Sequence, residues 1–284
     1  MSTPTDFEQM MLELVNRFRL DPTNEYARLV GVDADVEDAL SYFGVDLTAL
    51  ESQFTTLTAV APLAWNDLLS QSATTHSERM IRLDQQGHTF PGEPGLREKF
   101  DAVGYNSNSY IAENVFAFSE SAFYGHAGFV IDWGYDDSDY VNGVLRSDWK
   151  TNGDGIQDPP GHRNVMMSSN YTEIGIAVIE ERDNTTDVGP YVTTQHFGGR
   201  SDYVAQFVGV VIDDLDGDRF YDMGEGLGGV TVELSNGATT YSTTTWAAGG
   251  WQIQVPADTY TIVFSGGALS GTVTTTAGLG TENV

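Results

Sequence analysis

Cysteine is absent from this chain, so no disulfide bond stabilises it and a cysteine nucleophile is excluded. Cations are scarce: Lys99 and Lys150 are the only lysines, and 13 basic against 41 acidic residues give a formal net charge of −28. Because phosphate binding needs the opposite charge, nucleic acid and anionic membrane surfaces are not expected partners. Long apolar runs are also missing, since none approaches the roughly 18 residues that a membrane-spanning helix needs.

The histidines form the first informative pattern. There are five, and two of them lie in short glycine-containing segments typical of loops: His88 in GHTFPG and His162 in PPGHRN. Glu113, in AEN, and Asp136, in the motif W-x-x-D, come between them. Imidazole nitrogens and carboxylate oxygens can bind a metal ion, and a carboxylate can also fix the tautomer of a histidine that moves a proton near pH 7. Spacing alone leaves ordinary hydrogen-bonded residues as an equal alternative.

Six segments follow one another in an order typical of one protein family. They are LVNRFRLDP, APLAWNDLLSQSATTHSERM, GHTFPGEPGLREKFDAVGY, IAENV, GHRNVMMSSNYTEIGIAV and YVTTQHFG. In this order they resemble bacterial members of the CAP superfamily (cysteine-rich secretory, antigen-five and pathogenesis-related proteins). The resemblance covers about residues 6–199, apart from an insertion-like stretch at about 32–58, and implies a three-layer α-β-α sandwich.

The same resemblance implies roles for three of the singled-out residues. His88 matches the first cavity histidine of the family, and His162 matches the second, in the GHR version of its G-H motif. Glu113 matches the acid of the G-E-N motif, with Ala112 where glycine is usual. The two histidines are thereby expected to bind a divalent metal, zinc or magnesium.

The fourth member of the expected site departs from the family pattern. Relatives with a complete set usually carry W-x-x-E, whereas this chain has Trp133 followed by Asp136, a side chain one methylene shorter. Asp137 is an equally available carboxylate. The cavity tetrad implied by the resemblance is His88, Glu113, Asp136 and His162.

The remaining histidines lack such support and are expected to be structural. His76 shares a helical face with Ala73 and Met80, which favours a packed or cavity-rim position over a ligand. His196 lies on the strand-like segment YVTTQHFG, and His126 lies in AFYGHAGF. No catalytic role is assigned to any of the three.

Hydrophobic spacing predicts an α+β fold with a change in character near residue 200. Apolar residues recur at helical spacing over 7–20, where the Asp-Pro pair at 21–22 ends the helix, and a second helix is expected after Trp65. The segments 173–181 and 191–197 are typical of strands. We therefore expect residues 1–199 to form the three-layer domain.

Residues 203–284 have a different composition, in which glycine, threonine and valine dominate and histidine is absent. Short β-prone runs such as QFVGVVI, VTVEL, WQIQV and YTIVF are separated by the turn signals SNG, AAGG and PAD. This pattern predicts a second domain, a small all-β sandwich.

The second domain contains the strongest metal signal, the segment DLDGDRFYDMGE. Positions 1, 3, 5, 7, 9 and 12 of a calcium-binding loop are filled by Asp214, Asp216, Asp218, Phe220 through its carbonyl, Asp222 and Glu225. Glycine falls at position 4 and Arg219 occupies position 6, where glycine normally permits a sharp turn. With the following GLGGVTVEL, the segment resembles the B-type calcium-binding repeats of bacterial serine-aspartate repeat adhesins. We expect structural calcium here; the alternative is a solvated acidic turn.

Three functions remain open at this level. The first is a binding module for a divalent ion and a small molecule, lipid or peptide. The second is a metal-assisted or acid-base hydrolase with peptidase-like chemistry, although HExxH and GxSxG motifs are both absent. The third is a non-catalytic, calcium-stiffened surface or adhesion protein. We favour binding, because one scaffold serves unrelated roles in this superfamily and the residues alone do not support catalysis.

Location rests on the resemblance alone. The first residues lack the basic start and apolar core of a secretory signal. The chain stops at GLGTENV soon after a strand-like segment, which is typical of a fragment of a longer protein. The resemblance implies an extracellular protein, secreted or on the cell surface.

Overall fold

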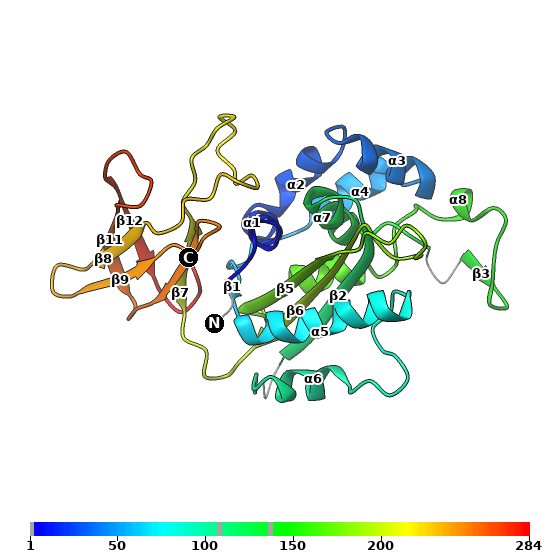
Figure 1. The fold of residues 1–284 in the computed structure, drawn as a ribbon. Coiled ribbons are helices and arrows are strands. Elements are labelled where there is room, and N and C mark those ends of the chain that lie inside the picture. Colours follow the sequence, from blue (N-terminus) through cyan, green and yellow to red (C-terminus); the bar gives the residue numbers. More distant parts are fainter. Residues whose placement is uncertain (1–2, 107–109, 136–138) are drawn as a thin grey trace.

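The computed structural model describes residues 3–106, 110–135 and 139–284 (Figure 1). The helices are α1 (Asp6–Leu20), α2 (Pro22–Leu29), α3 (Ala34–Phe43), α4 (Leu47–Phe54), α5 (Asp67–Leu83), α6 (Leu96–Ala102), α7 (Ala122–Ile131), α8 (Trp149–Asn152) and α9 (Gly161–Met166). The first strands are β1 (Ala64–Trp65), β2 (Tyr110–Ser119), β3 (Tyr140–Val141), β4 (Val144–Leu145), β5 (Glu173–Glu180) and β6 (Tyr191–Gly199). The later strands are β7 (Gln206–Val210), β8 (Thr231–Ser235), β9 (Thr240–Thr244), β10 (Gly250–Gln254), β11 (Asp258–Ser265) and β12 (Val273–Leu279).

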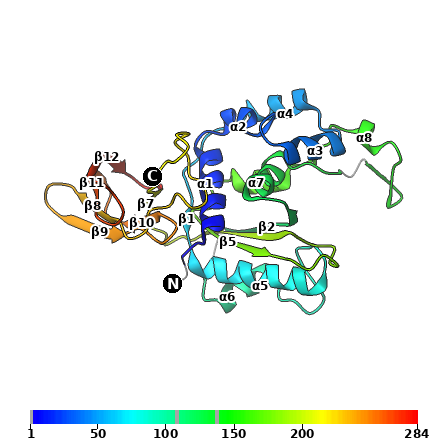
Figure 2. The same cartoon turned by 45° about the horizontal axis from the view of Figure 1, so that its top comes forward.

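A four-stranded sheet in the order β1-β5-β6-β2 forms the middle layer of the N-terminal part. β5 and β2 both pair antiparallel with β6, while β1 runs parallel to β5. Helix α5 packs against one face of the sheet, and α1 and α7 pack against the other (Figure 1, Figure 2). A Cβ atom on Gly175 would collide with the backbone of Leu69 and Ser70, so this glycine permits the close approach of α5 to β5. The predicted mixture of helices and sheet is confirmed.

Helix α1 has a local reason for each of its ends. Thr5 caps its first turn, and the Glu8 side chain accepts a hydrogen bond from the Thr5 backbone N–H in return. Asp21 ends the helix, and Pro22 then begins α2 at a position where a proline needs no N–H donor. The helix is buried along Met11, Leu14, Val15 and Phe18, which are fully inaccessible.

The insertion-like stretch at 32–58 is an integral part of the core. It forms α3 and α4, each of which begins at an aspartate whose side chain accepts two backbone N–H groups. Val36 and Leu40 of α3 and Leu50 and Phe54 of α4 are buried in the same cluster as α1.

Two antiparallel sheets make up the C-terminal part, β10-β7 and β12-β11-β8-β9. One hydrophobic cluster connects them, with Phe207 and Trp251 from the first sheet and Val232, Tyr260 and Ile262 from the second. The turn-separated β-prone runs of the sequence therefore correspond to strands.

The C-terminal part docks against α1 and β1, which border it in both views (Figure 1, Figure 2). The Gln252 side chain donates to the Trp65 carbonyl at 3.0 Å and accepts from the Trp65 backbone N–H at 2.9 Å. Asn283 donates to the carbonyls of Pro62 and Thr172 at 3.0 Å each. Among the residues described, no helix has both the length and the apolar character required to cross a membrane.

Candidate functional site

Glu113 lies at the centre of a polar cluster between β2 and the segments beside it. Strand pairing sets it directly opposite His196 of β6, and its side chain is only 4% exposed. Because a carboxylate only accepts, the ring nitrogens facing it donate: His88 Nδ1 to Oε1 at 2.9 Å and His196 Nε2 to Oε2 at 2.7 Å. Lys99 Nζ donates to the same Oε2 at 3.0 Å. Three donors thus surround one buried acid.

The charges in this cluster follow from its burial. Burial by itself raises the pKa of Glu113, but hydrogen bonds from His196 and His88 hold that pKa well below its ordinary value. Burial lowers the pKa of His196 despite the attraction of Glu113, so the ring is neutral near pH 7. The ammonium group nearest to ionised Glu113 is that of Lys99, at 3.0 Å.

The polar cluster around Glu113 also includes His76 and Glu93. His76 is fully buried, and its Nε2 donates to the Gly87 carbonyl at 2.9 Å. Its Nδ1 lies 2.8 Å from Glu93 Oε1 and 3.1 Å from Lys99 Nζ. The neutral ring accepts from Lys99, whereas the protonated ring donates to Glu93.

His76 and His196 were expected to be structural, and both are buried, but they belong to the same network as Glu113. Sequence analysis missed Lys99 and Glu93 as further members. Only the pairing of β2 with β6 places His196 opposite Glu113, and no local pattern reveals that pairing. His88 is the exposed member of the cluster, with 57% of its side chain accessible.

His162 forms a second, separate pair. Its Nδ1 donates to Asp132 Oδ1 at 2.6 Å, and its backbone N–H donates to Asp132 Oδ2 at 2.9 Å. Asp132 is fully buried and ends α7 in the left-handed conformation, with φ +60°. Among the described residues, no hydrogen bond or ion pair joins the side chains of this pair to those of His88 and Glu113.

The predicted fourth acid, Asp136, and the alternative, Asp137, lie outside the described residues. The carboxylate that contacts His162 is Asp132, which directly precedes Trp133. His88 and His162 each turn Nδ1 towards a carboxylate, an arrangement by which proteins orient metal-binding imidazoles. Within the described ranges, neither histidine belongs to a group of three acidic or histidine side chains with ligand atoms inside 4.8 Å. A metal there needs ligands beyond these pairs.

An aromatic cavity of about 370 Å³ adjoins His162. Its polar side chains include His162, Gln86 and Gln157. Its aromatic lining is Phe43, Phe116, Phe118, Phe129, Trp133, Tyr135 and Tyr140. A neighbouring hollow of about 530 Å³ shares four of these residues, Phe43, Phe116, Phe118 and Trp133. Largely apolar walls with a few polar groups are typical of a small-ligand site.

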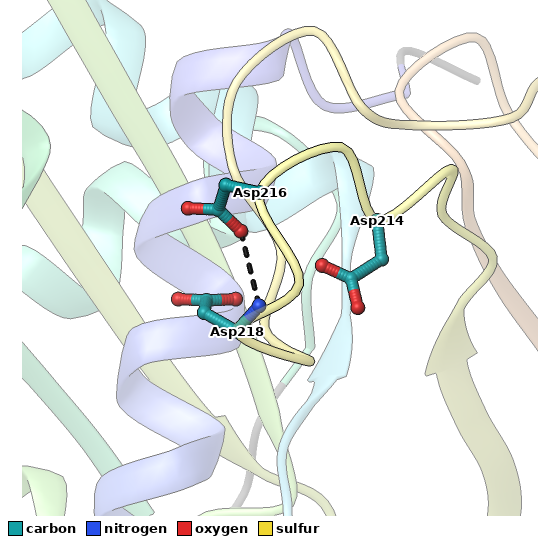
Figure 3. A group of neighbouring side chains, drawn as sticks. All are labelled: Asp214, Asp216 and Asp218. Carbon is teal, nitrogen blue, oxygen red and sulfur yellow. Dashed lines mark hydrogen bonds between the residues drawn. The ribbon is translucent and has the colours of Figure 1, made fainter.

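The acidic loop after β7 gathers its carboxylates in two overlapping groups of three. Ligand oxygens of Asp214, Asp216 and Asp218 lie within 4.8 Å of one another (Figure 3). The same holds for those of Asp216, Asp222 and Glu225. Asp216 is common to both groups. The pKa of Asp222 is raised by burial and by the negative charges of the neighbouring acids Asp218, Asp216 and Glu225. The clustered acids therefore repel one another.

The backbone of this loop is compact and makes internal hydrogen bonds. Leu215 and Asp222 donate their N–H groups to the two oxygens of Glu225, at 2.8 and 3.1 Å. Arg219, at the position where glycine is usual, adopts the left-handed conformation with φ +67°. The loop therefore makes the expected turn without the expected glycine.

The loop also contacts α1. Tyr221 is buried among the hydrophobic residues of the N-terminal core, and the Arg17 guanidinium lies 4.5 Å from the centre of the Phe220 ring. The acidic loop is thus part of the contact between the two halves of the chain.

Comparisons with known proteins identify a family for the N-terminal part of the chain. A model of the cysteine-rich secretory protein family, CAP, matches residues 12–197. An extracellular protein containing an SCP domain, from Bacillus anthracis, is 17% identical, with a TM-score of 0.33; the match covers 60% of this chain and 44% of that one. An outer surface protein from Borrelia burgdorferi is 13% identical, with a TM-score of 0.36, and the match covers 60% of this chain and 96% of that one. No curated protein sequence matches.

Proposed function

The chain belongs to the cysteine-rich secretory protein (CAP) family, and from this membership we propose that its N-terminal part is a binding module for a small molecule, lipid or peptide. The aromatic cavity beside His162 carries the proposal, because it combines apolar walls with a histidine oriented by Asp132. The proposed setting is extracellular, either secreted or on the cell surface. A non-catalytic adhesion role is compatible with the same cavity.

A second candidate function is acid-base hydrolysis at the same place. The short hydrogen bond between Asp132 and His162 would hold the ring in the tautomer that leaves Nε2 free as a base. Within the described part of the chain, however, no serine or threonine hydroxyl forms a hydrogen bond with His162, so no side-chain nucleophile is paired with this base. Binding is therefore the stronger proposal.

We further propose that His88 and His162 contribute to a divalent-metal site, for zinc or magnesium. His88→Ala/His162→Ala protein is expected to lose at least tenfold in metal affinity, because imidazole nitrogens are the neutral ligands available. Calorimetric titration of calcium-loaded protein measures this affinity, with exposed Thr89→Ala as the control. The two single variants show whether the histidines share one ion. If they do, either change alone weakens binding of that ion; if the sites are independent, each change weakens only one of two binding events. Equal binding by parent and double variant would sink the metal site.

Residues 203–284 are proposed to form a separate β-sandwich domain that binds structural calcium. The support is the hydrophobic cluster shared by its two sheets and the oxygen-only donor set of the acidic loop. Calcium prefers such hard oxygen ligands, and Asp214, Asp216, Asp218, Asp222 and Glu225 would hold it together with the Phe220 carbonyl. Bound calcium would offset the repulsion between the acids and rigidify the loop.

Arg219 offers a test of the calcium-loop geometry. Arg219→Gly is expected to stabilise calcium-loaded protein by about 0.5 kcal/mol, because glycine adopts positive φ without the steric cost paid by arginine. Arg182→Gly is the control, since Arg182 is exposed and lies outside the positive-φ positions. Thermal unfolding in excess calcium compares the two. A loss of stability in both variants would contradict the strained-turn interpretation.

A further inference from the structure

A second cavity, of about 210 Å³, lies where α1 faces β7 and β10. Three tryptophans line it, Trp65 from β1, Trp246 and Trp251, together with aliphatic side chains such as Leu12 and Leu63. Trp65 and Trp251 are nearly inaccessible, whereas exposed Leu20 and Val284 lie at its rim. The cavity is therefore built between the two halves of the chain and is separate from the site at His162.

Two side chains of α1, Gln9 and Glu13, bring polar groups to this cavity that are not used in contacts with the backbone. Gln9 is fully buried, and its Nε2 donates to Glu13 Oε1 at 2.6 Å. Its own Oε1 is buried and has no hydrogen-bond partner among the described residues, a costly state for an amide oxygen. A Cβ atom on Gly250 would collide with Gln9 Oε1, so glycine at this position makes room for the amide. Gln9 lines the cavity, and its unmatched oxygen lies beside the wall, against Gly250, so a donor in the cavity could satisfy it once the amide turns towards the donor.

Glu13 supplies the charge. Burial raises its pKa to about 7, with the Gln9 hydrogen bond acting in the opposite direction. Among the described residues that line the cavity, its side chain is the only titratable one. On the adjacent acidic loop, Tyr221 has its pKa raised by burial and by Asp6 and Glu13, so it is neutral. The carboxylate consequently faces no cation within the cavity wall.

We propose that this cavity binds a small protonated amine. An ammonium group would donate to the Glu13 carboxylate and to Gln9 Oε1, and its hydrocarbon part would lie against the indole rings, which attract cations and apolar groups alike. At roughly 30 Å³ for each water-sized group, the cavity holds about seven such groups. This limits the ligand to a short aliphatic amine. Anions are excluded by the like charge of Glu13. A metal ion is disfavoured because the Asn16 and Gln252 oxygens of the wall already accept from the backbone N–H groups of Leu63 and Trp65, which leaves too few ligands.

The proposal predicts a distinctive pH dependence. Only ionised Glu13 pairs with the ammonium group, and with a pKa near 7 its ionised fraction falls about 30-fold between pH 8 and pH 5.5. A primary amine stays protonated over this range, so affinity is expected to fall by about the same factor. Binding also lowers the pKa of Glu13, and protons are released near pH 7.

The test uses n-butylammonium and its neutral analogue n-butanol on the full, calcium-loaded chain. Tryptophan fluorescence and calorimetry at pH 8 are expected to show saturable binding of the amine, and at least tenfold weaker binding of the alcohol. Glu13→Gln keeps the shape of the side chain and is expected to weaken amine binding at least tenfold. Glu233→Gln, an exposed change on β8, is the matched control and is expected to bind as the parent does.

Three results would overturn the proposal. They are saturable binding of neither compound, equal affinity for amine and alcohol, and unchanged amine affinity in folded Glu13→Gln protein. If circular dichroism shows that this variant is unfolded, the test uses the parent protein alone. Amine affinity that does not fall between pH 8 and pH 5.5 then overturns the proposal, and a fall near 30-fold supports it.

Discussion

Glu113→Gln protein is expected to lose about 3–5 kcal/mol of the free energy of unfolding, the largest effect of any single polar change considered for this chain. The change leaves the buried Lys99 ammonium with Glu93 as its remaining acid, at 3.6 Å. It also replaces a carboxylate that accepts from both His88 and His196 by an amide with a single oxygen, so one of these two ring donors then faces the amide NH2 group. Urea unfolding at pH 7 measures the loss. Glu120→Gln, an exposed change just beyond β2, is the control and should stay within about 0.5 kcal/mol of the parent.

Two further measurements separate lost charge pairing from general damage. Lys99→Met added to Glu113→Gln removes the unpaired charge, so the double variant is expected to be more stable than Glu113→Gln alone. The second measurement is the stability of the protein as the pH is lowered. Because the pKa of Glu113 is lowered by folding, its contribution is present above the pKa of the unfolded chain and is lost as pH falls below it. Glu113→Gln should therefore flatten the decline of stability below about pH 4.5. A variant as stable as Glu120→Gln would refute the buried-pair account.

The sequence predicted this cluster only in part, for a physical reason. His88 and Glu113 carry short-range motif signals, and they do form a hydrogen bond. The contribution of His196 depends on the register between β2 and β6, which are separated by many residues along the chain. Lys99 reaches the same acid from α6. Sequence spacing does not encode such tertiary pairings.

The acid that contacts His162 was also not predicted from the sequence, and the predicted Asp136 lies outside the described residues. A pattern centred on Trp133 points forward to Asp136, whereas the described contact runs back to Asp132. Asp132 reaches His162 because it ends α7 at φ +60°, a conformation uncommon for a non-glycine residue. Local propensity does not foresee that turn, since the packing of α7 against β2 and α9 fixes it.

Helices and strands were more predictable than their packing. The apolar spacing of residues 7–20 matches α1 almost to the residue, and the alternation in 173–181 matches β5. Family membership, predicted from motif order, is confirmed for the N-terminal part. The burial of Tyr221 against α1 was not predicted, because a tyrosine inside an acidic loop carries no local signal for a distant core.

Removal of calcium is expected to lower the free energy of unfolding by about 4 kcal/mol when the ion had been present at about a thousandfold excess over its dissociation constant. Thermal unfolding in excess calcium and in a chelator measures this difference. The loss has two sources: the acids of the loop repel one another without a cation, and Phe220 and Tyr221 of the same loop pack on α1. Loosening the loop thus weakens the contact between the halves of the chain.

The decisive variant is Asp216→Asn, because Asp216 belongs to both acidic groups of the loop. In calcium it is expected to be less stable than the parent, since it loses a charged ligand. In chelator the order should reverse, since the same change removes one of the mutually repelling charges that raise the pKa of Asp222. Asp213→Asn, exposed and outside both groups, should follow the parent in both conditions. A solvated acidic turn predicts no calcium dependence in any variant, so the reversal of order would distinguish a calcium site from a merely acidic loop.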